Sequence, residues 1–324
     1  MLKILHSARY TGTPWDILKD VIPNGFIVET LEKATYDCLR HQCIDANYLL
    51  VSGRLPIDEG VLSAAKHLKM IQRTGVGIEM LDLKAIKNHG IPVYVNSGVN
   101  ARSVAEHTVT LMLACLKRLT LVNAQVHSGI WEKQENGVMT HELYGKKIGL
   151  VGMGNIGKQV ASLLMAFGAQ VFYTDIIRQP SNEEEYLHLT FIDHFEDLLP
   201  IVDILSFHCP LTNNNLEILN AKTLALIKPG AVVINTARGK LIDSYALYEA
   251  IQSGIVSAAG LDTHYEEPLR RDYPLLGLDN VILTPHIGGL SYEAFYSMMK
   301  GAIDNIVAFE SGLLDQIESK RLKY

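Results

Sequence analysis

The segment from residue 146 to 175 constrains the fold more than any other part of the chain. A strand-like apolar run leads into Gly152, Gly154 and Gly157, which open a helix-like stretch. A second strand-like run then ends at Asp175. Glycines at this spacing are common in turns. Their combination with a preceding strand, a following helix and a carboxylate at the end of the next strand is much less common. Together they predict a strand–helix–strand unit that binds a dinucleotide.

Each residue of this unit has a physical reason to be there. Gly152 permits the tight turn, Gly154 lets the backbone approach a pyrophosphate, and Gly157 lets the helix pack closely on the strand. The N-terminus of the helix offers free N–H groups and a positive dipole to the phosphates. Asp175 lies 18 residues after Gly157, where a carboxylate accepts ribose hydroxyls and repels a 2′-phosphate. We therefore predict NAD rather than NADP, although Arg178 nearby would suit a phosphate.

Strand-like and helix-like segments alternate along the whole chain, which predicts parallel sheets covered by helices. The length of 324 residues suits two domains, with boundaries near residues 98 and 289. The expected strands are 3–6, 26–29, 48–51, 69–73 and 92–95, then 147–151, 170–174, 203–208, 231–235, 257–261 and 281–284. The expected helices are 14–21, 34–43, 57–66, 101–119, 156–167, 195–199, 221–227, 244–253 and 292–310, with a loop over 129–137.

Composition narrows the function classes. A net charge of −6 gives no basic footprint for nucleic acid. The four cysteines lack the paired spacing of a metal site, so we expect reduced thiols and no metal. The N-terminus turns polar after five residues and no apolar stretch reaches membrane length. These features predict a cytoplasmic protein without a membrane partner, and residues 183–185 are expected in a solvated loop or helix start.

Polar side chains follow three of the later strands. Arg238 comes just after the strand 231–235, Asp262 and Glu267 follow the next one, and His286 follows the last. Ligands of open parallel sheets bind at the carboxyl ends of strands. An arginine fork suits a carboxylate, histidine exchanges a proton near neutral pH, and a glutamate raises the pKa of that histidine. This set predicts hydride transfer coupled to proton transfer on a small acid that bears a hydroxyl. Glu266 and Glu267 are not distinguished at this point.

These residues resemble the D-isomer-specific 2-hydroxyacid dehydrogenases over nearly the whole chain. The resemblance implies that Arg238, Glu267 and His286 form the catalytic set, which favours Glu267 over its neighbour. The matching blocks are R-T-G-V-G-I-E-M-L-D (73–82), S-V-A-E-H-T (103–108), V-G-M-G-N-I-G (151–157), H-C-P-L-T (208–212), N-T-A-R-G (235–239), L-D-T-H-Y-E-E-P (261–268) and T-P-H-I-G-G (284–289).

The resemblance also implies an architecture. A Rossmann NAD domain, residues 99–289, would be inserted into a flavodoxin-like substrate domain formed by residues 1–98 and 290–324. The helix over 101–119 would form the interface of a homodimer. The substrate carboxylate would meet backbone N–H groups around Val76 and Gly77 as well as Arg238, and Arg54 could contact the distal end of the substrate.

The implied cofactor site is larger than the glycine loop alone. The chain departs from the family pattern at Glu79-Met80 in the substrate loop and at His264, which we expect to serve packing. The residues expected to contact NAD are Gly152, Gly154, Asn155, Ile156, Gly157, Asp175, Cys209, Pro210, Thr108, Thr236, Ala237, Asp262 and Gly288.

The resulting interpretation is an NAD-dependent oxidoreductase acting on a D-2-hydroxyacid or its 2-oxoacid. Formate-type chemistry is disfavoured, because formate dehydrogenases carry glutamine where Glu267 stands. A phosphite-type dehydrogenase and an NAD(H)-sensing corepressor-like protein keep the same triad and remain alternatives. The pocket for the substrate side chain, and with it the choice between glycerate, phosphoglycerate, lactate and branched-chain acids, is left open.

Overall fold

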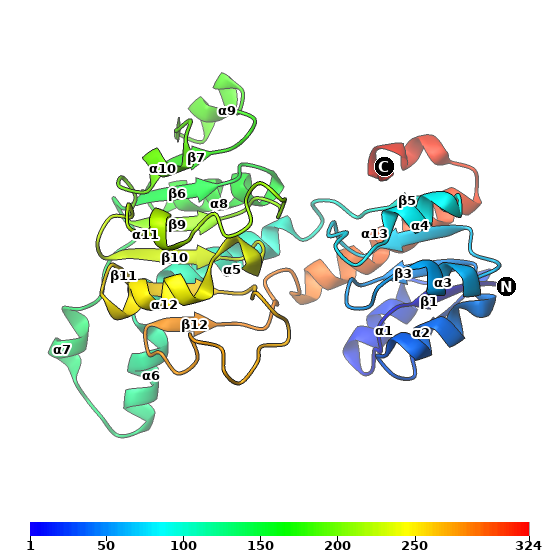
Figure 1. Cartoon of the computed structure of the whole chain (residues 1–324), viewed down its shortest axis with the longest axis horizontal. Coiled ribbons are helices and arrows are strands. Elements are labelled where there is room, and N and C mark those ends of the chain that lie inside the picture. Colours follow the sequence, from blue (N-terminus) through cyan, green and yellow to red (C-terminus); the bar gives the residue numbers. More distant parts are fainter. Residues whose placement is uncertain (324) are drawn as a thin grey trace. The chain divides into compact units, whose positions relative to one another are not determined.

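The computed structural model describes residues 1–323 and divides into two compact units (Figure 1). The outer unit contains both ends of the chain, Met1–Asn100 and Leu290–Tyr324. The inner unit is the continuous segment Ala101–Gly289. Each unit has its own parallel sheet with helices on both faces.

The outer unit is built on a five-stranded parallel sheet in the order β2-β1-β3-β4-β5. This is the flavodoxin-like strand order. Its strands are β1 (Leu2–His6), β2 (Phe26–Thr30), β3 (Tyr48–Val51), β4 (Met70–Arg73) and β5 (Val93–Tyr94). Its helices are α1 (Thr13–Asp20), α2 (Tyr36–Gln42), α3 (Glu59–Ala64), α4 (Leu83–Asn88) and α13 (Tyr292–Glu310).

Alternating residues of each strand point to opposite faces of this sheet and form two apolar cores. Leu5 and Leu49 pack with α2, α3 and α4, whereas Ile4 and Leu50 pack with α1 and α13. Both faces are therefore apolar, as expected for a parallel sheet that is covered on both sides. The C-terminal helix α13 completes one face, so residues from the two ends of the chain share one core.

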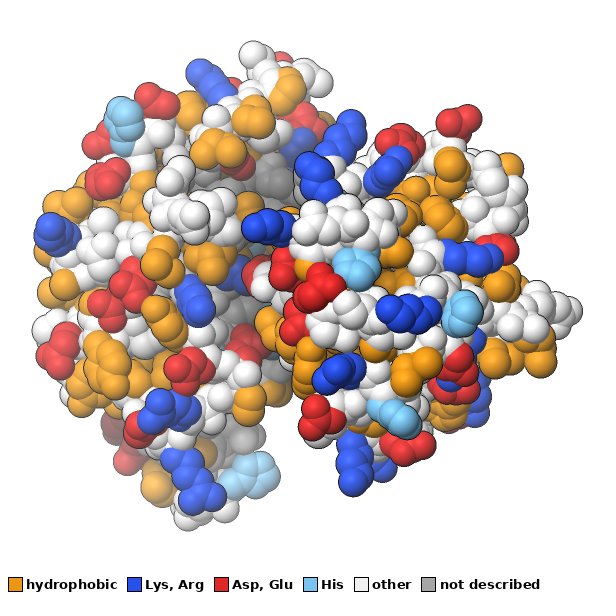
Figure 2. Space-filling model, turned by 45° about the vertical axis from the view of Figure 1, so that its right-hand side comes forward, with side chains coloured by type: hydrophobic (Ala, Val, Ile, Leu, Met, Phe, Trp, Pro, Cys, Tyr) orange, Lys and Arg blue, Asp and Glu red, His pale blue; other side chains and the backbone are white. Residues whose placement is uncertain are grey.

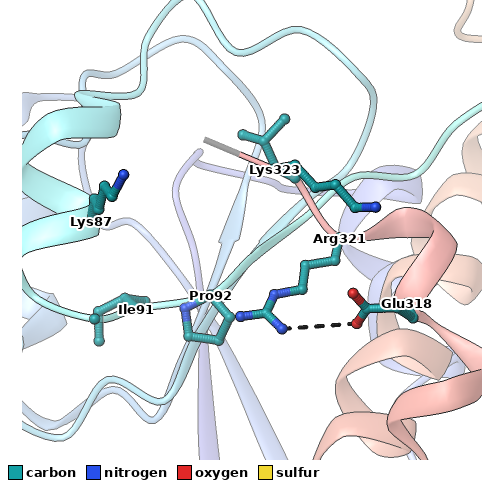
Figure 3. A pocket seen from close by; sticks show the side chains of 8 residues that line it. Lys87, Ile91, Pro92, Glu318, Arg321 and Lys323 are labelled. Carbon is teal, nitrogen blue, oxygen red and sulfur yellow. Dashed lines mark ion pairs between the residues drawn. The ribbon is translucent and has the colours of Figure 1, made fainter.

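The C-terminal segment also extends the sheet. The Leu322 N–H donates to the Val93 carbonyl oxygen at 2.9 Å, and the Val95 N–H donates to the Lys320 carbonyl oxygen at 2.9 Å. A cavity of about 460 Å³ lies beside this pairing and contains none of the predicted site residues (Figure 3). It is lined by Lys87, Gly90, Ile91, Pro92, Glu318, Arg321, Leu322 and Lys323.

The inner unit is built on a seven-stranded parallel sheet in the order β12-β11-β10-β9-β6-β7-β8. The order reverses beside β6, as in the dinucleotide-binding fold. Its strands are β6 (Lys147–Val151), β7 (Gln170–Thr174), β8 (Leu189–Phe191), β9 (Ile204–Phe207), β10 (Ala231–Asn235), β11 (Val256–Leu261) and β12 (Val281–Leu283). Its helices are α5 (Ala101–Leu116), α6 (Leu119–His127), α7 (Lys133–Gly137), α8 (Asn155–Ala166), α9 (Ser181–Tyr186), α10 (Phe195–Leu198), α11 (Ala221–Leu224) and α12 (Ser244–Gln252).

Two separate cores cover the faces of this sheet. Helices α5 and α8 pack on one face with strand residues such as Leu150 and Ile234, and helices α10, α11 and α12 pack on the other with residues such as Leu205 and Val233. Over the face of the chain seen in Figure 2, basic and acidic side chains are interspersed. Because helices cover both faces of the sheet, the carboxyl ends of the strands form the edge where polar turns collect.

Several expected elements differ from the structure. The helix expected over 101–119 ends at Leu116, because Arg118 adopts the left-handed conformation with φ of 51°. A separate helix, α6, follows, and α7 occupies part of the expected loop. Strand β8 and helix α4 were not expected. Among the described residues no single helix is long and apolar enough to cross a membrane, and α5 with α6, bent by 62°, passes that test only as a pair.

Candidate functional site

The last strand of the inner unit ends in a turn that presents His286. The backbone of His286 is left-handed, with φ of 57°, and its N–H donates to the Thr284 carbonyl oxygen at 3.0 Å. The ring lies with Nδ1 2.8 Å from Oε2 of Glu267. About half of the side chain, 49%, is exposed. The turn therefore holds one ring nitrogen on a carboxylate while the ring stays accessible.

Glu267 is held at both of its oxygens. Oε2 meets His286, and Oε1 accepts the backbone N–H of His264 at 3.0 Å. Although burial opposes ionisation, these two hydrogen bonds keep the pKa of Glu267 below its ordinary value. The hydrogen bond to Glu267 in turn raises the pKa of His286, against the opposing effects of burial and of the Arg238 charge. The pair thus favours an imidazolium beside a carboxylate.

Arg238 lies in the turn that follows β10. Asn235 fixes this turn, since its amide oxygen accepts the Ala237 N–H at 3.0 Å and its amide nitrogen donates to the Arg238 carbonyl oxygen at 2.8 Å. A Cβ at Gly239 would lie 1.9 Å from the carbonyl carbon of His264. Glycine is needed there because the Arg238 turn touches the backbone of the segment that leads to Glu267. The inner unit thereby brings the three predicted catalytic residues to one edge.

Asp262, which we predicted as a cofactor contact, lies buried beneath the His286 turn. Its carboxylate accepts hydrogen bonds from the Thr284 hydroxyl at 2.6 Å and from the N–H groups of Ile287 and Gly288 at 2.9 and 2.8 Å. Against the effect of burial, these bonds and one from His107 hold the pKa of Asp262 well below its usual range. A Cβ on Gly288 would lie 2.9 Å from Asp262 Oδ2. In the structure, Asp262 stabilises the turn that carries His286.

The glycine loop has the geometry of a phosphate cradle. Gly152, with φ of 102°, packs so tightly that a Cβ would lie 2.6 Å from the Cys209 backbone nitrogen. A Cβ on Gly157 would lie 2.3 Å from the Gly152 carbonyl oxygen. A Cβ on Gly154 would meet open space, and Gly154 caps α8 without a side chain. The residues present therefore fit a dinucleotide, with open backbone where a pyrophosphate would lie.

The carboxylate at the end of β7 and its basic neighbour are both engaged. Asp175 Oδ2 accepts the Met153 N–H at 2.6 Å, which ties it to the glycine loop. Arg178 donates two hydrogen bonds to Glu184, at 2.9 and 2.8 Å, and its guanidinium lies 5.2 Å from the centre of the Phe191 ring. Because Glu184 occupies the Arg178 fork, that arginine is a poor partner for a 2′-phosphate.

The remaining predicted cofactor residues flank these turns. Cys209 and Pro210 follow β9 beside Gly152, and Asn155 and Ile156 begin α8. Thr108 is fully buried on α5, and its hydroxyl lies 2.9 Å from that of Thr236 at the start of the Arg238 turn. This contact joins α5 to the Arg238 turn.

The predicted substrate residues lie in the outer unit, on the turns after β3 and β4. Arg54 is exposed, and Val76 is 52% exposed. Both turns are held by Arg73, whose guanidinium donates to the Val51 and Gly77 carbonyl oxygens at 2.6 and 2.5 Å. Sequence reasoning missed Arg73, and the available signal was a charged residue at the end of a buried strand.

The chain matches known proteins over most of its length. Residues 109–288 match the family model described as D-isomer specific 2-hydroxyacid dehydrogenase, NAD binding domain. A hydroxypyruvate reductase of Thermotoga maritima is 39% identical over 77% of this chain and 80% of the relative. A D-3-phosphoglycerate dehydrogenase of Archaeoglobus fulgidus is 34% identical over 90% of this chain, which spans 54% of that longer relative. A crystal structure of D-lactate dehydrogenase from Aquifex aeolicus, in complex with NAD and lactic acid, has a TM-score of 0.83 at 28% identity and covers 99% of this chain and 98% of that one.

Proposed function

The chain belongs to the D-isomer-specific 2-hydroxyacid dehydrogenase family, and we propose that His286 is the acid–base group of its reaction. The enzyme is an NAD-dependent dehydrogenase of small hydroxyacids. When bound, NAD would supply the acceptor for the hydride at C2 of the hydroxyacid, and NADH the donor for C2 of the oxoacid. The observation that carries the proposal is the 2.8 Å contact between His286 Nδ1 and Glu267 Oε2.

His286 moves the proton at its other ring nitrogen, Nε2. In oxidation Nε2 takes the proton of the substrate hydroxyl, and in reduction it returns a proton to the carbonyl oxygen. Glu267 supports both directions, because it fixes the ring and stabilises the imidazolium. Exposure of the ring allows contact with a substrate, whereas Glu267 keeps the same ring from turning.

Arg238 grips the substrate in this proposal. Its planar fork suits the carboxylate and the neighbouring carbonyl oxygen, and its charge stabilises the partial negative charge that develops on that oxygen. The Gly239 contact and the Asn235 bonds support this role, because they fix the backbone from which Arg238 extends. Arg54, Val76 and Gly77 are proposed as substrate contacts that select the side chain at C2 and the distal end of the acid.

We further propose that the enzyme is a cytoplasmic homodimer. Its four free cysteines suit a reducing compartment. Helix α5 buries ten of its residues within the inner unit, so the partner surface is better sought on the segment that follows it. That segment exposes several large apolar side chains, as an interaction surface does. They include Leu119, Val126, Trp131, Val138, Met139 and Tyr144. Replacement of Trp131 and Val138 by lysine should halve the mass measured by light scattering, and an unchanged mass would contradict this surface.

The proposed activity is tested by the oxidation of NADH with a panel of 2-oxoacids. The panel contains glyoxylate, pyruvate, hydroxypyruvate, phosphohydroxypyruvate and a branched-chain oxoacid, and chiral chromatography identifies the enantiomer formed. We expect turnover of at least one oxoacid and formation of the D-hydroxyacid. Tight NADH binding without turnover of any oxoacid would favour a sensing protein instead. Phosphite and NAD, assayed in parallel, test the phosphite-type alternative.

A further inference from the structure

Helix α5 supplies polar side chains to the turns that carry His286 and Arg238. We propose that His107 on this helix is a positioning residue for proton transfer, which acts on His286 through Thr284 and Asp262. The proposal rests on the proposed role of His286. His107 itself is not assigned contact with substrate or cofactor.

The direction of the hydrogen bonds follows from the contacts. His107 Nε2 lies 3.1 Å from the Thr284 hydroxyl oxygen, and that hydroxyl lies 2.6 Å from Asp262 Oδ1. An ionised carboxylate only accepts hydrogen bonds, so the Thr284 proton points to Asp262. Thr284 must then accept from His107, whose Nε2 carries a proton. The same Nε2 lies 3.4 Å from Asp262 Oδ1, so one imidazole supports both partners.

These partners hold the backbone beside the acid–base residue. Asp262 accepts the N–H groups of Ile287 and Gly288, the two residues after His286. His286 is left-handed, a conformation that a residue with a side chain rarely adopts unless its surroundings hold it there. Loss of the His107 bond would free Thr284 and Asp262 to shift, and the turn would shift with them.

A second side chain of α5, Ser103, forms a hydrogen bond with the turn that follows His286. The Ser103 hydroxyl donates to the Gly288 carbonyl oxygen at 2.7 Å. Ser103 and His107 are four residues apart and share one face of the helix. A Cβ on Gly288 would lie 3.2 Å from His107 Cδ2, so the ring also packs directly against the turn. The helix therefore contacts Gly288 by hydrogen bond and by packing.

The same helix reaches the Arg238 turn. The Thr108 hydroxyl donates to the Val104 carbonyl oxygen at 2.8 Å, so the 2.9 Å contact between Thr108 and Thr236 takes its proton from Thr236. Thr236 precedes Arg238 by two residues. Because neighbouring positions on one rigid helix contact both turns, α5 fixes the spacing between the acid–base group and the carboxylate-binding group.

The test compares two replacements of His107 with a control on the same helix. His107→Leu removes the N–H donor, His107→Gln keeps an N–H donor, and Glu106→Gln changes an exposed position whose partner is Arg102. We expect His107→Leu to lower kcat about 30-fold with KM for NADH unchanged, which corresponds to loss of about one hydrogen bond to a charged network. His107→Gln should recover kcat to within about threefold of wild type, and Glu106→Gln should match wild type. Equal losses in the Leu and Gln variants, or a Leu variant as active as wild type, would overturn the proposal.

A second measurement does not depend on turnover. Nuclear magnetic resonance of ¹⁵N-labelled histidine follows the titration of His286 in the unliganded protein, where Glu267, Asp262 and Arg238 are the charged groups that act on it. We expect His107→Leu to lower the pKa of His286, because the turn no longer holds the ring on Glu267. An unchanged titration would overturn the proposal even if wild type reduced no oxoacid, an outcome that would count only against the proposed function.

A third variant covers the case in which His107→Leu does not fold. Thr284→Val removes the middle of the chain of hydrogen bonds, and Thr284→Ser keeps the hydroxyl. We expect Val to reproduce the loss of kcat and Ser to restore it. A loss of kcat in the Ser variant equal to that in the Val variant would contradict the proposal.

Discussion

The carboxyl edges of the two parallel sheets each carry a histidine, and the two histidines have opposite chemistry. His6, the last residue of β1, is fully buried, and burial lowers its pKa to about 4. His286, just after β12, is half-exposed, and its hydrogen bond to Glu267 raises its pKa. The fold offers the same kind of position twice. A carboxylate partner and access to solvent suit one ring to the proposed proton transfer, whereas burial keeps the other neutral.

The side chains around His6 and His286 differ in the same way. His6 Nδ1 accepts the Ala8 N–H at 3.2 Å, and its ring packs at a tilt against Tyr10 with centroids 4.3 Å apart. His286 instead lies among Glu267, Asp262 and Arg238, three charged groups that all influence its pKa. His286 therefore pairs with a carboxylate, whereas His6 packs on an aromatic ring and has the cation Arg54 as its charged neighbour.

Replacement of each histidine by asparagine should separate the two edges most strongly. We expect His286→Asn to lower kcat about 10³-fold, because general acid–base catalysis contributes on this order. His6→Asn should leave kcat within about threefold, since Asn can still accept the Ala8 N–H. Steady-state assays give both values, and NADH fluorescence should report binding by both variants. Equal losses of kcat would show that the comparison is wrong.

The stability of the fold at acid pH should depend on His6. Its pKa is lowered from the ordinary 6.5 to about 4 in the folded state, so between these values the unfolded chain binds a proton that the folded chain does not. Stability is therefore lost as pH falls from 6.5 to 4, by up to about 3 kcal/mol. Urea titrations across this range should show a flatter dependence for His6→Asn than for wild type. Parallel curves would assign the acid sensitivity to other groups.

Removal of the charge on Glu267 should make His286 resemble an ordinary histidine. Glu267→Gln keeps the shape but weakens a charged hydrogen bond, so we expect kcat to fall about 10- to 100-fold. Reduction of an oxoacid needs protonated His286, and its rate falls as pH rises through the pKa of His286. That pKa is raised in wild type, so the alkaline limb of the rate profile should move to lower pH in the variant. A limb that stays in place would assign it to another group.

The smallest expected effect comes from a comparison of Asp175 with Asp262, two carboxylates at the carboxyl ends of strands in the inner unit. Asp262 is buried and accepts hydrogen bonds from Thr284, Ile287 and Gly288. Asp175 is only partly buried, and it accepts the N–H groups of Met153 at 2.6 Å and Ile177 at 3.3 Å. Asp175→Ala should reduce the preference for NAD over NADP about tenfold, because a like charge near the 2′-position is removed. The ratio of kcat/KM for the two cofactors measures this. An unaltered ratio would place the determinant elsewhere.

The sequence predicted the regular parts of the fold well because buried parallel strands are short apolar runs. Strands such as Tyr48–Val51 and Gln170–Thr174 have the expected bounds. Strand β8 was missed because Leu189–Phe191 is a short, half-buried edge strand. The break after Leu116 depends on the left-handed Arg118, a conformation that composition does not reveal.

Some residues of the candidate site could likewise be predicted from the sequence, and others could not. Arg238, Glu267 and His286 follow strands and fall in recognisable blocks, so the amino-acid sequence is enough to propose them. His107 lies 177 residues before Thr284 in the chain, and its helix has an ordinary apolar face. Arg73 ends a buried strand and ties two turns together. Such bracing contacts depend on how elements pack, which local patterns do not specify.

The bond between Ser103 and Gly288 has a consequence for how the protein is made. It brings the two ends of the inner unit within 2.7 Å of each other, so residues 101–289 form a closed, continuous body that can fold as soon as the ribosome has released it. The first residues of the outer unit are synthesised before the inner unit, but its core is completed last, because α1 covers only part of the face bearing Ile4 and Leu50 until α13 emerges. A released chain truncated before Tyr292 should therefore hold a protease-resistant inner unit after a protease-sensitive first hundred residues.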